Sequence, residues 1–335
     1  NTIQEYVYTG SDKGWVIRGG GNNTPNVVGL DPHVRGCPYG FIPIPNSKNV
    51  NGAPIGMPEN RSKFGWCVMK YMFLPYEPSK HTYDTYGLAW QDSYDLDKNN
   101  YKVISRANNT TDYLNNISNY NAKSICKNSM VNDKGEFLDP SFETISMPYN
   151  LYKLLVNDLF REGRNWTGGS FDSGKLYVGH SDNSPSKSIA PNSDDSLGYY
   201  LTENSTGDQR RTMYTSENYV IWDIVGNFWE HLYEGQNAAN NANGWREYKN
   251  INKATHPFSP NVLLGVDAST YDSTKGLGLS VYDNGSATIA NIGSSATFSY
   301  WLLRGSSFSL GASYSGLSTS LWNAYGLSYR GHNVS

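Results

Sequence analysis

Cysteine is scarce in this chain, which has three in 335 residues: Cys37, Cys67 and Cys126. An odd number argues against a complete disulfide framework, and it leaves two alternatives, one bridge with a third thiol or three reduced cysteines. The sequence also lacks a C-x-x-C pair and any cluster of cysteine with histidine. The common structural zinc sites are therefore not indicated.

The sequence also lacks a large excess of charge of one sign, and it lacks long apolar runs. Basic residues number 27 and acidic residues 30, for a formal net charge of −3. A nucleic-acid-binding surface needs a concentrated basic face, so we expect no nucleic-acid partner. No apolar run approaches the ~18 residues of a membrane span, and no signal-peptide pattern opens the sequence. We therefore expect no membrane span.

Aromatic residues, small polar residues and glycine are abundant instead. Aromatic content is 14% and glycine numbers 33, which predicts a core rich in rings and connected by short turns. Apolar residues at helical spacing predict an amphipathic helix over 150–161, ended by Gly163. We also expect a short helix at 122–127 and a strand at 67–74. Residues 168–215, dominated by Gly, Ser, Asn and Asp, are expected to be irregular.

One segment, 220–230, combines a β-prone apolar start, a turn at Gly226-Asn227, two tryptophans and two acids. It resembles the W-D-x-x-G-N-x-W-E signature of the formylglycine-generating-enzyme branch of the C-type lectin fold. Other stretches are similar to the opening strands, second helix, connecting loops and R-G-G-x-W strand of that branch. They are residues 37–45, 64–71, 145–148 with 150–161, 165–166, 179–183, 209–212 and 304–308.

The resemblance implies an α+β, C-type lectin-like fold of the formylglycine-generating type. Such a fold has small twisted antiparallel sheets, two helices and long irregular loops. We expect one domain over 36–335, preceded by an N-terminal extension over 1–35 with an edge strand at 4–9. Family members commonly end on a Phe-Arg strand, which this sequence does not reach.

Many members of the resembling subgroup are variable proteins of diversity-generating retroelements. In them, a reverse transcriptase randomises a C-terminal stretch that binds other molecules. The tail, about 301–335, alternates small residues with aromatics and has almost no charge. A Gly/Ser-rich β terminus is one explanation. A binding surface is the other, because Tyr and Trp give rigid contact area while Ser, Gly and Asn give adaptable hydrogen bonding.

The resemblance divides this tail into variable and fixed positions. The variable, outward-pointing candidates for ligand binding are Ser307, Phe308, Ser309, Leu310, Ser313, Tyr314, Trp322, Asn323, Tyr325, Gly326, Tyr329, Arg330, Gly331, His332 and Asn333. The expected fixed scaffold positions are Arg304, Gly305, Gly311, Gly316 and Leu317.

The signature turn is also a candidate metal site, because related folds hold a structural Ca²⁺ there. Carried over by position, Asp223 and Glu230 would supply side-chain oxygens, and Gly226 and Phe228 would supply backbone carbonyls. Calcium prefers hard oxygen ligands of this mixture. In the alternative, both acids accept hydrogen bonds from N–H groups of the turn.

The sequence does not indicate an enzyme. Formylglycine-generating enzymes depend on a C-terminal cysteine pair, and related sulfoxide synthases on a three-histidine iron motif, and the sequence has neither. His180-Ser-Asp182 cannot form a catalytic triad, because contiguous residues do not converge in space.

We therefore expect a monomeric domain that binds an unknown protein or surface ligand, located on a virion (phage or archaeal virus) or a cell surface. Two alternatives remain open. One is an oxidative enzyme of the formylglycine-generating type with a non-standard site. The other is a carbohydrate-binding adhesin, although the sequence lacks the Glu-Pro-Asn or Gln-Pro-Asp tripeptide of the usual sugar site.

Overall fold

The computed structural model describes the following residues, and every structural statement below concerns them: 5–8, 15–18, 37–47, 65–80, 82–84, 87–89, 102–109, 114–115, 117, 122, 125–126, 129–138, 147–171, 173–184, 186–200, 208–232, 263–266, 273–278 and 301–323. Only the backbone is described for residues 5–8, 15–18, 80, 82–84, 87–89, 114–115, 273, 301–302 and 320–323.

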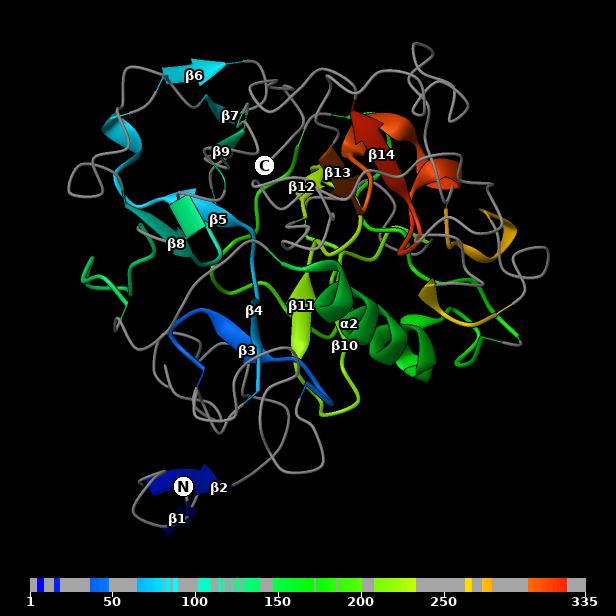
Figure 1. Ribbon diagram of the computed structural model, residues 1–335, viewed down its shortest axis with the longest axis horizontal. Coiled ribbons are helices and arrows are strands. Elements are labelled where there is room, and N and C mark those ends of the chain that lie inside the picture. The colour runs from blue at the N-terminus through cyan, green and yellow to red at the C-terminus, as the bar shows by residue number, and fades with distance from the viewer. Residues whose placement is uncertain are drawn as a thin grey trace, which may run out of the picture.

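The chain is α+β, with one long helix and several small sheets (Figure 1). The two-stranded sheets are antiparallel and pair β1 (Glu5–Tyr8) with β2 (Trp15–Arg18), β3 (Phe41–Pro43) with β4 (Cys67–Met69), β5 (Phe73–Pro75) with β8 (Val103–Ser105), and β10 (Thr212–Tyr214) with β11 (Val220–Trp222).

Two sheets have three strands. One is built from β6 (Thr82–Asp84), β7 (Gly87–Ala89) and β9 (Leu114–Asn115), and the other from β12 (Glu230–His231), β13 (Trp301–Arg304) and β14 (Ser320–Asn323). Short 3-10 helices are η3 (Pro78–Lys80), η4 (Gly163–Asn165), η6 (Ser273–Lys275), η8 (Phe308–Leu310) and η9 (Ala312–Tyr314). The α+β class expected from the sequence is thus confirmed.

The predicted helix forms as α2, Tyr149–Arg161. Its apolar stripe is buried, because the helical period places those residues on one face. The helix ends where Glu162 turns extended, with φ −78° and ψ 112°. Gly163 opens η4 and does not cap α2, which corrects the sequence expectation. A Cβ at Gly163 would meet the Gly169 carbonyl oxygen at 2.3 Å, so close backbone approach requires glycine there.

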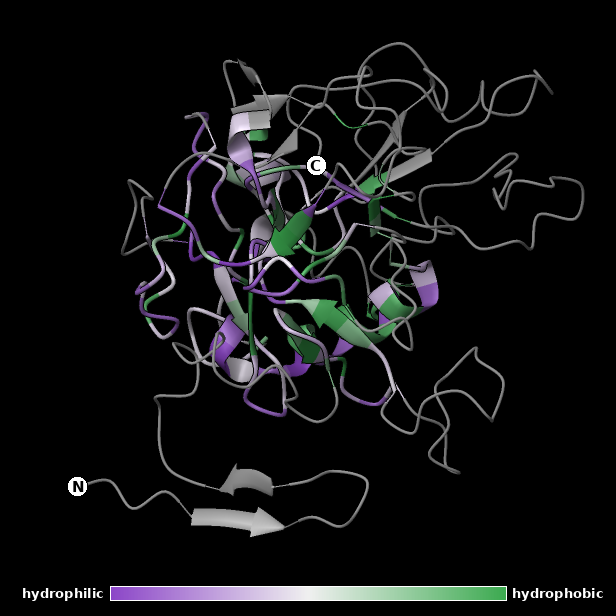
Figure 2. Cartoon of the chain, turned by 90° about the vertical axis from the view of Figure 1, so that its left-hand side faces the viewer, coloured by the Kyte–Doolittle hydropathy of each residue, from purple (hydrophilic) through white to green (hydrophobic). Residues whose placement is uncertain are grey.

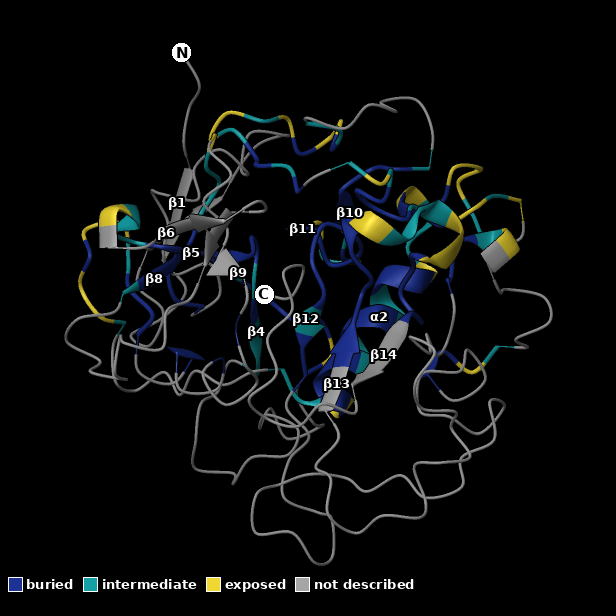
Figure 3. Ribbon diagram, turned by 90° about the horizontal axis from the view of Figure 1, so that it is seen from above, coloured by how far each residue is buried: buried dark blue, intermediate teal, exposed yellow. Residues whose placement is uncertain are grey.

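The largest core lies between α2 and the β10–β11 hairpin. Residues of the helix face and of the hairpin, with Leu277 and Leu317, form one buried cluster. Burying each large apolar side chain stabilises the fold by about 1.5–3 kcal/mol. Figure 2 shows hydrophobic segments in the interior of the described part, and in Figure 3 α2 carries buried residues together with half-buried ones.

The two tryptophans of the signature contact other clusters. Trp222 stacks on Tyr71, with ring centroids 6.5 Å apart, and Trp229 packs on Leu303. Ile221, Ile224 and Val225 of the same segment lie in the largest core and Phe228 lies in a further cluster, so the signature segment links four regions of the core.

The strand predicted at 67–74 is divided in two, β4 and β5. Between them, the Lys70 ammonium turns inward to the Asp195 carboxylate at 2.7 Å. The Lys70 backbone N–H donates to the Gly40 carbonyl, and its own carbonyl accepts from the Trp222 N–H, each at 2.9 Å. The chain changes pairing partner at this residue, from β3 to β8, and this ends the first strand.

Two further expectations have a structural counterpart. Residues 122, 125 and 126 are helical, within the short helix expected at 122–127. The edge strand expected at 4–9 forms as β1 and pairs with β2 over four residue pairs. The domain boundaries at 35 and 36 stay predictions.

Of the two cysteine arrangements left open by the sequence, the structure shows one disulfide bridge with a third, unbridged cysteine. Cys37 and Cys67 form a disulfide, with their Cα atoms 5.8 Å apart, and Cys126 is buried. The bridge ties the segment before β3 to the start of β4. Across the described ranges, no helix has the length and apolarity to span a membrane.

Candidate binding surface and its polar support

The signature turn after β11 depends on backbone in the left-handed region. Asp223, Gly226 and Asn227 have φ of 53°, 78° and 62°. Glycine is required at 226, because a Cβ there would lie 2.6 Å from the His180 carbonyl oxygen. The Asn227 N–H donates to that same oxygen at 2.8 Å. The turn is thereby fixed against the loop that carries His180.

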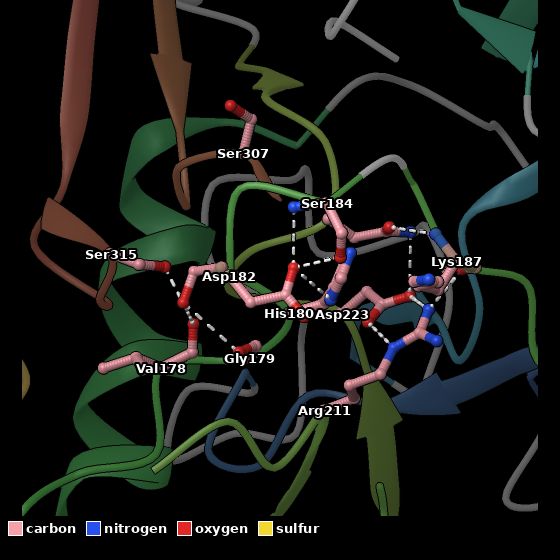
Figure 4. Close-up of polar contacts among 12 residues, drawn as sticks. Val178, Gly179, His180, Asp182, Ser184, Lys187, Arg211, Asp223, Ser307 and Ser315 are labelled. Atoms are coloured by element: carbon pink, nitrogen blue, oxygen red, sulfur yellow. Dashed lines mark hydrogen bonds and ion pairs between the residues drawn. The ribbon is translucent and has the colours of Figure 1, made fainter. Parts of the chain in front are cut away.

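Asp223 forms a fully buried ion pair with Arg211. Arg211 Nε donates to Asp223 Oδ1 at 2.7 Å, and Nη2 donates to Oδ2 at 2.6 Å (Figure 4). The remaining guanidinium N–H groups donate to the carbonyls of Lys187, Ser188 and Tyr200 at 2.7–3.0 Å. Both side chains are 0% exposed. All guanidinium nitrogens thus have partners, as a buried charge requires.

Glu230 is paired separately, with Arg304 directly opposite it in the β12–β13 register. Arg304 Nη1 also donates to the Ile224 carbonyl at 3.2 Å, and its guanidinium lies 4.8 Å from the Tyr152 ring centroid. Burial raises the pKa of Glu230 to about 7; Arg304 acts in the opposite direction and Asp223 adds to the rise.

This arrangement does not fit the expected calcium site. Calcium takes 6–8 oxygen ligands, including carboxylates. Asp223 and Glu230 are each engaged by a different guanidinium, and the described residues contain no group of three or more His, Cys, Asp or Glu that could hold a metal. The Gly226 N–H donates to the Gly305 carbonyl at 2.8 Å, and Phe228 is fully buried. The acids also differ from the alternative of bonding to turn N–H groups, since their partners are arginines.

The candidate variable positions fall into four sets, one of which is the buried pair Ser307 and Phe308. Ser309, Ser313 and Tyr314 are exposed and Leu310 is half-buried, in the η8–η9 loop. Trp322 and Asn323 lie in β14, where only the backbone is described. Tyr325, Gly326, Tyr329, Arg330, Gly331, His332 and Asn333 lie outside the described residues.

Ser307 and Phe308 correct the expectation of an outward orientation, because both are buried. The Phe308 ring lies 5.8 Å from the Phe228 ring, edge to face, and 6.4 Å from the His180 ring. The Phe308 N–H donates to the Asn227 carbonyl at 3.0 Å. This residue anchors the loop to the signature turn and cannot vary freely.

Among the expected scaffold positions, Gly311 is half-buried and has φ 72° at the junction of η8 and η9, a backbone conformation that suits glycine. Arg304, Gly305, Gly316 and Leu317 are buried. Gly305 has φ 83°, and a Cβ at Gly316 would meet the Leu277 carbonyl carbon at 2.2 Å. The tail therefore combines a tightly packed base with an exposed loop.

Sequence reasoning missed the buried polar groups below this loop. His180 is 0% exposed, and its Nδ1 lies 3.6 Å from Asp182 Oδ1. Asp182 accepts hydrogen bonds from the Ser184 backbone N–H and hydroxyl. The Ser181 hydroxyl donates to the Val178 and Gly179 carbonyls and not to His180. The sequence motifs at 179–183 and 209–212 indicated these loops. They did not indicate which groups the polar side chains contact.

Comparisons with protein-family models, with curated proteins and with solved structures found no match for this chain.

Proposed function

We propose that this protein binds a ligand or receptor through a diversified C-terminal surface, carried on a C-type lectin-like scaffold of the formylglycine-generating type. In this proposal the tail is varied by a diversity-generating retroelement, and the protein acts on a virion or cell surface. The Cys37–Cys67 bridge supports such a location, because disulfides persist in oxidising environments.

The observation that carries the proposal is the η8–η9 loop. Its exposed residues are Ser309, Ser313 and Tyr314. They lie between two buried residues, Phe308 before them and Ser315 after them. The Ser315 hydroxyl donates to the Val178 carbonyl at 2.8 Å. Exposed side chains on such a loop can change at little cost to the core, because surface substitutions usually change the free energy of unfolding by less than ~0.5 kcal/mol.

The chemistry of the loop also suits binding. Tyr314 is 43% exposed, which places a rigid aromatic ring at the surface beside two small hydroxyl residues. Tyrosine supplies contact area at low entropy cost, and serine supplies adaptable hydrogen bonds. We propose that the surface continues into Trp322, Tyr325 and Tyr329.

The first test is a tolerance map. Libraries randomised at Ser309, Leu310, Ser313 and Tyr314 should mostly fold, since surface substitutions usually change the free energy of unfolding by less than ~0.5 kcal/mol each. Phe308→Ala is the buried counterpart and should cost about 3–5 kcal/mol. Equal sensitivity at both kinds of position would show that the loop is part of the core.

The second test is selection for binding. The same library, displayed on phage and panned against a single purified probe such as lysozyme, should yield clones that bind the probe when the parent does not. Reverting position 314 in a selected clone should weaken binding, because aromatic residues dominate binding energy. Failure to obtain any binder from a well-folded library would count against the proposal.

The genomic locus provides an independent check. A neighbouring reverse-transcriptase gene, with a near-copy of the 3′ end of this gene, is the expected finding. A locus without either, and a tail that is identical in many isolates, would contradict diversification.

A further inference from the structure

Four basic side chains are buried in the described part of the chain, and three of them contact a carboxylate. The three pairs are Lys70 with Asp195, Arg211 with Asp223 and Arg304 with Glu230. The fourth is Arg210, which is 9% exposed and has no ion pair. A buried charge normally has a partner of opposite sign, because removing it from water is costly. Arg210 is therefore an exception that calls for a physical reason.

The guanidinium of Arg210 is held at two of its three nitrogens. Nε donates to the Thr212 hydroxyl at 2.9 Å, and Nη1 donates to the Arg164 carbonyl at 3.5 Å. Its central carbon lies 4.8 Å from the Tyr214 ring centroid and 5.3 Å from that of Tyr177. Nη2 is buried without a hydrogen-bond partner. Two N–H donors are thus available beside two aromatic rings.

The surrounding frame is rigid, because Asn165 ties its parts together. The Asn165 amide donates to the Tyr214 carbonyl at 2.9 Å and accepts from the Tyr214 N–H at 2.7 Å. Its backbone carbonyl accepts from the Tyr177 N–H at 3.1 Å. Asn165 is 0% exposed, so η4, β10 and the Tyr177 segment hold their relative positions. β10 therefore lies against η4.

The nearby charges leave the single positive charge of Arg210 without a directly bonded anion. Arg164 is paired with Glu162 at 2.8 Å. The Asp194 carboxylate accepts hydrogen bonds from the Ser196 N–H and hydroxyl. These hydrogen bonds are the largest cause of the lowered pKa of Asp194, and the charge of Arg210 is the smallest. The field of Arg210 therefore reaches the surface at Asp194, but the two side chains do not touch.

A neutral phenol lies at the same place. Burial, and then the neighbouring Tyr177, raise the pKa of Tyr199 to about 12. Its hydroxyl is therefore protonated at neutral pH and is hydrogen-bonded to Tyr177, so it brings no negative charge to the surroundings of Arg210.

We propose that Arg210 is the centre of a fixed binding site for a small monocarboxylate, separate from the C-terminal surface. One uncompensated positive charge matches a monoanion better than a divalent phosphate. The burial of Nη2 restricts the ligand to a slender group and excludes a carboxylate fixed on a protein surface. Tyr177, Tyr199 and Tyr214 are each partly exposed, and in this proposal the ligand reaches Nη2 by a rotation of one of these side chains on an otherwise fixed backbone.

Acetate titration of the full chain tests the site, with chloride at matched ionic strength as the reference, by calorimetry and by melting temperature. Saturable binding of acetate is expected. Arg210→Gln should weaken it at least about tenfold, since hydrogen bonds to charged groups are the strong ones. Arg161→Gln is the matched control, because Arg161 is exposed at the end of α2 and should change nothing.

A second variant keeps the test valid if Arg210→Gln does not fold. Asp194→Asn removes the competing surface charge but keeps the oxygen that accepts from Ser196, and it should tighten acetate binding about two- to threefold. No saturable acetate binding, or equal affinity in wild type and Arg210→Gln, would overturn the site. Binding of phosphate more tightly than acetate through Arg210 would overturn the assignment to a monocarboxylate.

Discussion

Replacing Arg211 by methionine is the most direct test of how the signature turn is held. Methionine keeps much of the side-chain length but removes the charge and all five donors. Asp223 then stays buried with only the Asn227 amide, at 3.2 Å, as a partner. Breaking a buried pair on one side costs about 3–5 kcal/mol, because the remaining charge is uncompensated.

The loss of stability in Arg211→Met should lower the melting temperature. The carbonyls of Lys187, Ser188 and Tyr200 also lose their donor, at about 1 kcal/mol each before relaxation. These contributions add up to about 6–8 kcal/mol before relaxation, and after relaxation we expect a loss of at least about 4 kcal/mol, against a whole-protein stability of about 5–15 kcal/mol. At about 2–4 °C per kcal/mol, the melting temperature should fall by about 8–16 °C.

Thermal and denaturant unfolding measure this effect, each with and without chelator. Arg161→Met, at the exposed end of α2, is the control and should cost less than ~0.5 kcal/mol. A cost below about 1 kcal/mol for Arg211→Met would refute the reasoning that this pair holds the turn. A chelator-induced fall in the wild-type melting temperature, restored by Ca²⁺, would show instead that Asp223 and Glu230 bind metal.

Three further predictions concern other parts of the chain. Burial lowers the pKa of His231 to about 4, so the unfolded state takes up a proton first as the pH falls below about 6.5. Relative to His231→Gln, the wild type should lose about 2 kcal/mol of stability between pH 7 and pH 5, and parallel curves would contradict this. Ser306 has φ 77°, so Ser306→Gly should stabilise the protein by about 0.5–1 kcal/mol in denaturant titration; a loss would argue against the left-handed backbone. Reducing the Cys37–Cys67 bridge, which spans 30 residues, should cost about 3–4 kcal/mol, and reductant should leave a Cys37→Ser, Cys67→Ser variant unchanged.

The local features of the fold were accessible from the sequence. The apolar period over 150–161 predicted α2 to within one residue, because helix periodicity is a property of neighbouring residues. Gly226 and Asn227 predicted the turn after β11, since few residues adopt the left-handed region. The tight base of the tail was predicted in the same way, from Gly305 and Gly316.

The partners of the polar side chains were not accessible in this way. An acid in a turn presents the same carboxylate whether it binds a metal or an arginine, so Asp223 and Glu230 were equally consistent with calcium. The pairing of these acids with Arg211 and Arg304 appears only in the folded chain, and the calcium site stays a prediction. The inward turn of Lys70 toward Asp195, which divides the predicted strand, likewise depends on a contact across 125 residues.

The sequence by itself determined the α+β class, the helix and the turn, because each depends on spacing along the chain. The tertiary structure decided which cysteines pair, which carboxylate meets which arginine, and that Phe308 is an anchor while Tyr314 is exposed. Phe308 and Tyr314 belong to the same aromatic, serine-rich pattern, but Phe308 packs in a buried cluster that includes Phe228, whereas Tyr314 is exposed. Burial depends on which residues from elsewhere in the chain pack against a side chain. The local composition of the sequence does not specify those residues.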